Sequence, residues 1–103
     1  MAIINSLLTN AEAASVFTSA GNTAITTVYL CNNSTSAVAV NVFVVANTFA
    51  ANTTNIIYSN LSIAGNDTFI METERLLFTN GDFLAANAGV DGSVAATVSY
   101  TSI

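Results

Sequence analysis

"TAITTVYLCNNSTSAVAVNVFVVA", residues 23–46, contains two apolar segments separated by the polar residues 33–36. Both segments are rich in β-branched and aromatic residues, which fit a pleated and half-buried surface. The second segment, residues 37–46, is apolar on both faces of an extended strand, with Val38, Val40, Val42 and Val44 opposite Phe43 and Val45. A strand of this kind is either central in its sheet or lies against a second protein.

The C-terminal segment predicts a strand with two different faces. In residues 93–103, Val94, Ala96, Val98 and Tyr100 share one side, and Ser and Thr dominate the other. This alternation is typical of an antiparallel strand that is buried on one face. Further strands are expected in residues 14–20, 55–63, 67–74, 75–79 and 83–88. We therefore predict an all-β fold, an antiparallel β-sandwich or jelly roll of about eight short strands.

Short turns are expected between the last predicted strands. Asn80, Gly81 and Asp82 separate two of them, and Asp91 and Gly92 precede the final one. The dipeptides Asn-Gly and Asp-Gly favour the positive φ angles of tight hairpin turns. Both positions are therefore predicted to be hairpins.

The N-terminal residues allow two interpretations. Ile4, Leu7, Leu8 and Ala11 follow helical spacing, whereas residues 2–5 also suit a strand. We divide the chain into an N-terminal arm with a first strand, residues 1–19, and a β-sandwich, residues 20–103, in a single domain. The arm either packs on its own domain or orders against a neighbouring chain, and its candidate docking residues are Ile3, Ile4, Leu7 and Leu8.

Composition indicates a surface that other protein chains cover. Only 7% of the residues are charged, whereas soluble domains average about 25%. The chain has no Lys and no Pro, the residues that usually protect sheet edges from pairing. One cation against six acids argues against binding nucleic acid or an anionic membrane surface.

The inventory of reactive side chains argues against an enzyme. The chain lacks His and Lys, and its single cysteine, Cys31, has no histidine to activate it. Glu72 and Glu74 share one face of an extended strand and form the one conceivable catalytic pair. We expect no catalysis, no cofactor and no metal.

Two ligand classes remain as weaker alternatives. Asp67, Asp82 and Asp91 occupy turn-like segments that suit Ca²⁺, although Asp is also a common turn residue because its side chain accepts bonds from nearby backbone. Carbohydrate binding through Tyr29, Tyr58, Phe78 or Tyr100 is the other alternative. Aromatic residues that alternate with valines are more often core.

The only basic residue, Arg75, lies close to Glu72 and Glu74 in sequence. Neither face of residues 69–78 is cleanly apolar, which predicts a bend or bulge near residues 73–75. A guanidinium at such a corner holds a carboxylate bidentately and bonds freed carbonyl groups. We interpret Arg75, Glu72 and Glu74 as a structural clasp.

Three segments carry a family resemblance: residues 15–45, residues 62–88 and the final strand from Ser93. With "YLCN" at 29–32, "TERL" at 73–76 and "NGD" at 80–82, the chain resembles small virion structural proteins of tailed bacteriophages, particularly those of marine bacteria and cyanobacteria. The resemblance implies a compact β-sandwich present in many copies on a particle. It implies no catalytic residue.

These observations lead to one functional expectation. The chain is expected to be a non-enzymatic virion protein, assembled in the host cytoplasm, that decorates or cements a phage capsid by binding across neighbouring shell subunits. Its expected partners are the major capsid protein and further copies of itself. The alternatives are a neck, tail or fibre component, and a Ca²⁺- or glycan-binding β-module.

Overall fold

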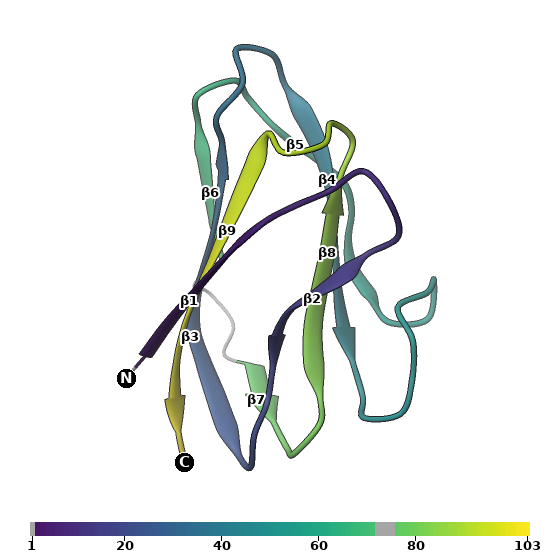
Figure 1. Ribbon diagram of the computed structural model, residues 1–103, viewed down its shortest axis with the longest axis vertical. Helices are drawn as coiled ribbons and strands as arrows, with labels where there is room; N and C mark the ends of the chain where they lie inside the picture. The colour runs from purple at the N-terminus through teal and green to yellow at the C-terminus, as the bar shows by residue number, and fades with distance from the viewer. Residues whose placement is uncertain (1, 72–75) are drawn as a thin grey trace.

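The computed structural model describes residues 2–71 and 76–103, and in these ranges the chain forms nine β-strands and no helix. The strands build two antiparallel sheets, which lie on either side of the molecule in Figure 1. The first sheet contains β1 (Ala2–Leu7), β9 (Val94–Ser102), β3 (Thr23–Asn32), β6 (Thr68–Met71) and β7 (Leu76–Phe78). The second sheet contains β2 (Ala14–Thr18), β8 (Phe83–Ala88), β4 (Val38–Val45) and β5 (Ile56–Ile63). The predicted all-β sandwich is confirmed.

The two apolar segments within residues 23–46 become the central strands. β3 pairs with β9 along one edge and with β6 and β7 along the other. β4 lies between β8 and β5 in the second sheet. A strand with two hydrogen-bonded neighbours has no free edge, and its side chains are covered on the inner face. The inner face of β4, with Val38, Val40 and Val42, is therefore apolar, and Asn41 is the one polar residue of the strand.

The hydrophobic core lies between the two sheets. Val94, Ala96 and Val98 of β9 are at most 1% exposed, which confirms the predicted alternation of that strand. From the second sheet, Val40 and Leu84 reach the same core and are equally buried. Burying apolar surface in this way supplies most of the stabilisation of a small domain.

The turns occur where they were predicted, but they do not form hairpins. Asn80 and Gly81 lie in the turn between β7 of the first sheet and β8 of the second. Asp91 and Gly92 lie in the turn between β8 and β9, which also belong to different sheets. The hairpin prediction is therefore wrong, because positive φ angles suit a tight chain reversal whether or not the flanking strands pair with each other.

The N-terminus forms a strand rather than a helix. β1 pairs antiparallel with β9 from Ala2 opposite Tyr100 to Leu7 opposite Ala95. β2 pairs with β8, and its Val16 and Phe17 are 5% exposed. Of the two alternatives for this segment, residues 2–19 therefore pack on their own domain, with Leu8, Val16 and Phe17 in the core.

The predicted clasp lies outside the described residues. β6 ends at Met71 and β7 begins at Leu76. Glu72, Glu74 and Arg75, and the bend expected near residues 73–75, fall between them. The clasp stays a prediction.

Candidate functional site

The described strands are uncharged along their whole length. The four acids of the described chain, Glu12, Asp67, Asp82 and Asp91, all lie in connecting segments. Among residues 2–71 and 76–103, the outer faces and edges of both sheets therefore carry neutral side chains. Charged residues are one of the devices that keep sheet edges from pairing with other chains.

The outer face of the first sheet carries exposed apolar side chains. We name Ile3, Leu7, Tyr29, Ile70 and Leu77 the apolar face. Strand register places them on the side away from the core: Ile3 pairs with Ser99, Tyr29 with Thr97, and Leu77 with Ala24. Ile3, Leu7 and Leu77 are at least 60% exposed. Thr97 and Ser99 of β9 separate the β1 side chains from Tyr29 on this face. A face with several exposed large apolar side chains and, among the described residues, no charge suits a protein partner.

The apolar face continues to an unprotected edge at β1. The six residue pairs between β1 and β9 run without a register shift. The outer strands of the second sheet are less regular, because a shift occurs within β2 next to β8 and within β5 next to β4. Bulges of this kind blunt an edge, whereas a regular strand is a template for a further strand.

The structure divides the predicted docking residues. Ile3 and Leu7 lie on the apolar face in the edge strand β1. Tyr29 lies on the same face in the interior strand β3. Ile4 lies opposite Val98 on the core side and is 38% exposed. Leu8 is buried in the hydrophobic core and anchors β1. Ile3 and Leu7 are therefore the predicted docking residues that point away from the core.

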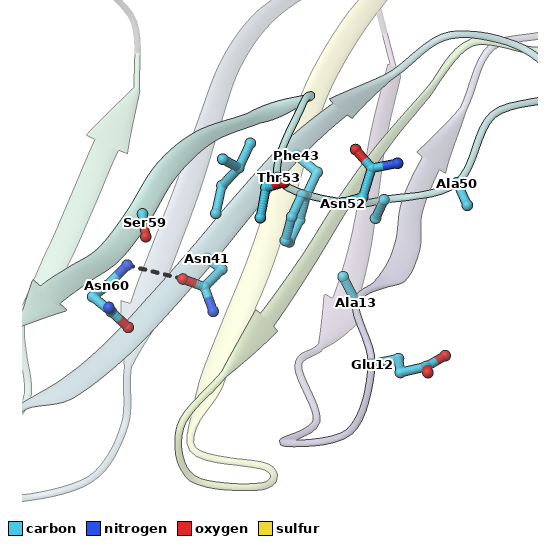
Figure 2. Close-up of a pocket in the computed structure, with 11 residues that line it drawn as sticks. Glu12, Ala13, Asn41, Phe43, Ala50, Asn52, Thr53, Ser59 and Asn60 are labelled. Atoms are coloured by element: carbon cyan, nitrogen blue, oxygen red, sulfur yellow. Dashed lines mark hydrogen bonds between the residues drawn. The ribbon is translucent and has the colours of Figure 1, made fainter.

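A groove lies on the outer face of the second sheet. We name it the Phe43 groove, and its volume is about 660 Å³. Its lining residues come from β4, β5, the connection between them and the segment before β2: Asn41, Phe43, Ile56, Ser59, Asn60, residues 50–53, Glu12 and Ala13. Figure 2 shows Phe43 behind the connection that carries Thr53, with Ser59 and Asn60 on one side and Ala13 on the other. The groove was not predicted.

A chain of amide hydrogen bonds ties the walls of the Phe43 groove together. The Asn87 side-chain nitrogen donates to the Ala11 carbonyl at 3.0 Å, and the Asn41 nitrogen donates to the Asn87 side-chain oxygen at 3.0 Å. The Asn41 oxygen accepts from the Asn60 backbone N–H at 2.8 Å (Figure 2). The signal in the sequence was two asparagines within otherwise apolar strands.

The aspartates proposed as calcium ligands bond to nearby backbone instead. Asp82 accepts hydrogen bonds from the backbone N–H of Thr79 and of Asn47, each at 2.9 Å, and from the Thr79 hydroxyl at 3.0 Å. The bonds from the Thr79 N–H, then the Asn47 N–H and the Thr79 hydroxyl, lower the pKa of Asp82. Asp67 accepts from the Thr68 N–H at 2.8 Å. In residues 2–71 and 76–103, no three His, Cys, Asp or Glu side chains lie together as a ligand set.

The aromatic residues proposed for sugar contact are mostly core residues. Tyr58 packs against Phe69 with ring centres 5.3 Å apart, and Tyr100 packs against Phe17 at 4.5 Å. Phe78 is 3% exposed. Phe78 is therefore wrong as a sugar contact, Tyr58 and Tyr100 are half-buried against the core, and Tyr29 is exposed. Phe43 was not singled out because it alternates with valines in a predicted core strand.

Comparison with known proteins adds no relative. No protein-family model, curated protein or solved structure matches the chain. The part of the chain that the structure describes contains no helix long and apolar enough to cross a membrane.

Proposed function

We propose that the chain is a non-enzymatic structural protein of a bacteriophage particle that decorates the capsid and binds across neighbouring shell subunits. The observation that carries the proposal is the uncharged apolar face beside an unprotected edge strand, β1. A neighbouring shell subunit covers this face and adds a strand at β1, so that backbone hydrogen bonds supply affinity and apolar side chains supply packing. The sequence resemblance supports the same assignment.

A particle that carries many copies of the chain suits this surface. The apolar face is small, and each contact alone would be weak. Many copies on a symmetric shell compensate, because each shell offers the same site repeatedly and neighbouring copies stabilise one another. The net charge of −5 keeps free copies soluble before assembly.

The first test is the copy number and position of the chain on purified virions, from quantitative mass spectrometry and cryo-electron microscopy. Hundreds of copies that follow the shell symmetry support decoration. A small ring at a vertex or along the tail would replace it with a neck, tail or fibre role. Absence from the particle would refute the virion assignment.

The second test asks whether the apolar face is the docking surface. A variant with Ile3→Thr and Leu7→Thr places β-branched residues that suit a strand at both positions but removes exposed apolar area. We expect it to fold and to lose binding to particles that lack the chain. Phe49→Thr is the matched control, because Phe49 is as exposed as Ile3, at 66%, and follows β4 of the other sheet. Equal binding by the two variants would refute this docking surface.

Cys31 provides an internal probe of the same contact. It lies half-buried on the outer face of β3, opposite Ala95 and Thr68. N-ethylmaleimide should react with the free chain faster than with the chain on particles. Equal reaction rates would show that a different surface meets the shell.

A further inference from the structure

The Phe43 groove is independent of the proposed docking surface. It lies on the outer face of the second sheet, and the apolar face lies on the outer face of the first. The two outer faces of a sandwich point in opposite directions. A chain that docks through the apolar face therefore leaves the groove open to solvent.

The chemistry of the groove is neutral and mixed. Phe43 and Ile56 supply apolar surface, and Asn52, Thr53, Ser59 and Asn60 supply amide and hydroxyl groups. Its one ionisable lining residue is Glu12, whose carboxylate points away from Phe43 in Figure 2. A carboxylate at the rim disfavours an anionic ligand, and too many polar groups line the groove for a lipid chain.

The polar side chains around Phe43 have unused hydrogen-bonding capacity. Among the hydrogen bonds of the described residues, none involves the side chains of Thr53, Ser59 or Asn60. Each hydroxyl can donate and accept, and an amide offers both functions in one plane. These groups are exposed, so they are available to a ligand that enters the groove.

The walls of the groove are fixed before any ligand binds. The amide chain from Ala11 through Asn87 and Asn41 to Asn60 joins one wall to the other. In the connection between β4 and β5, the Asn55 side chain accepts from the Asn52 N–H at 3.0 Å and donates to the Ala50 carbonyl at 2.9 Å. A preorganised site loses less conformational entropy on binding.

From these features we infer that the Phe43 groove binds an uncharged glycan. A sugar ring has an apolar C–H face, which packs on an aromatic ring, and a rim of hydroxyls, which pair with amides and hydroxyls. The volume of about 660 Å³ lies within the range of roughly 300–1,000 Å³ that is usual for small-ligand sites. The proposal does not depend on the virion role.

The test is a titration of the ¹⁵N-labelled chain with maltotriose, mannotriose and triacetylchitotriose, followed by amide NMR shifts. We expect at least one of them to shift the amides of Thr53, Ser59 and Asn60 saturably, while those of Ile3 and Tyr29 stay unchanged. Glycerol at the same hydroxyl concentration should not shift the amides of Thr53, Ser59 and Asn60. The absence of saturable shifts at the groove with all three sugars would overturn the proposal, as would equal shifts with glycerol.

Two variants make the test specific. Phe43→Leu keeps an apolar side chain but removes the aromatic ring, and it should weaken binding at least about tenfold. Phe49→Leu makes the same change on an exposed phenylalanine of the β4–β5 connection that does not line the groove, and it should bind as the wild type does. If Phe43→Leu stays folded and binds as tightly as the wild type, the assignment is overturned. If it unfolds, Thr53→Ala with Ser59→Ala replaces it, and undiminished binding by that variant overturns the proposal.

Discussion

Asn41 and Asn87 lie opposite each other on β4 and β8, and the Asn41 side-chain amide donates a 3.0 Å hydrogen bond to the Asn87 side-chain oxygen. Both are half-buried on the outer face of the second sheet. Together they join the Ala11 carbonyl, before β2, to the Asn60 N–H in β5. A polar ladder thus crosses the second sheet from one edge to the other.

Replacement of Asn87 by alanine should destabilise the fold. The change removes two hydrogen bonds at a half-buried site, which amounts to about 1–2 kcal/mol. Urea unfolding measures the loss, and Asn41→Ala in a double-mutant cycle should show a coupling of about 0.5–1.5 kcal/mol. Asn5→Ala is the control, because its bond to Thr97 is exposed. Additive effects of the two variants would contradict the ladder.

Asn32 should be the most sensitive polar residue in the described chain. It is fully buried, its amide nitrogen donates to the carbonyls of Ser36 and Ile63 at 2.9 Å, and its oxygen accepts from the Ser34 N–H at 2.9 Å. Asn32→Ala leaves buried groups unpaired, and we expect a loss of about 3 kcal/mol in urea unfolding.

The neighbouring residue is the matched control for that change. Asn33 is exposed, one residue after the end of the same strand, so Asn33→Ala should change the free energy of unfolding by less than about 0.5 kcal/mol. Similar losses in the two variants would show that the amide of Asn32 is not the source of the effect.

The sequence predicts the strands better than their partners. β3 and β8 have the predicted bounds, because runs of β-branched and apolar residues between polar or glycine-containing turns are local signals. The assignment of β7, β8 and β9 to alternate sheets is not local. Asn80-Gly81 permits a reversal, but the burial of Phe78 and Leu84 in a shared core decides which strands pair.

For the candidate surfaces, too, the sequence indicates individual residues better than their arrangement in space. Ile3, Ile4, Leu7 and Leu8 were predicted together as docking residues of the N-terminal segment, and only the pairing of β1 with β9 separates the two that point away from the core. The Phe43 groove was missed, since its residues are distributed over residues 12–60 and only the antiparallel pairing of β4 with β5 brings Phe43 next to Ile56. Asn41 and Asn87 were the available clue, because an amide in an apolar strand needs a partner.

A side chain at Gly81 should destabilise the fold. The φ of Gly81 is +90°, and an added Cβ would overlap the side chain of Asn47. Gly81→Ala combines backbone strain of about 1–2 kcal/mol with this clash. Gly21 has a similar φ of +76° but no atom within 4 Å of the added Cβ, so Gly21→Ala reports the strain alone. Thermal unfolding should show the larger loss for Gly81→Ala, and equal losses would contradict the close approach to Asn47.

Asp82 should make stability fall at low pH. Hydrogen bonds from Thr79 and Asn47 lower its pKa in the folded chain relative to the unfolded chain. A lowered pKa means that the stabilisation is present above the unfolded pKa, about 3.9, and is lost as the pH falls through the folded value. Asp82→Asn should therefore flatten the dependence of the melting temperature on pH below about 4. Glu12→Gln removes a carboxylate that makes no turn contact, so this variant should keep a steeper pH dependence than Asp82→Asn. Identical profiles for the two variants would contradict the role of Asp82.

Leu7 and Leu8 are adjacent in sequence, but Leu8 should affect folding and Leu7 should affect assembly. Leu8 is 2% exposed in the core, whereas Leu7 is 60% exposed on the apolar face. Leu8→Ala should cost about 2–4 kcal/mol in urea unfolding because it leaves a cavity, and Leu7→Ala should cost less than about 0.5 kcal/mol. If the apolar face meets a shell subunit, Leu7→Ala should nevertheless weaken binding to particles. If Leu7→Ala is as stable as the wild type and binds particles equally well, the contact lies elsewhere. Equal stability matters because a change in folding could otherwise mask the effect of the lost apolar area.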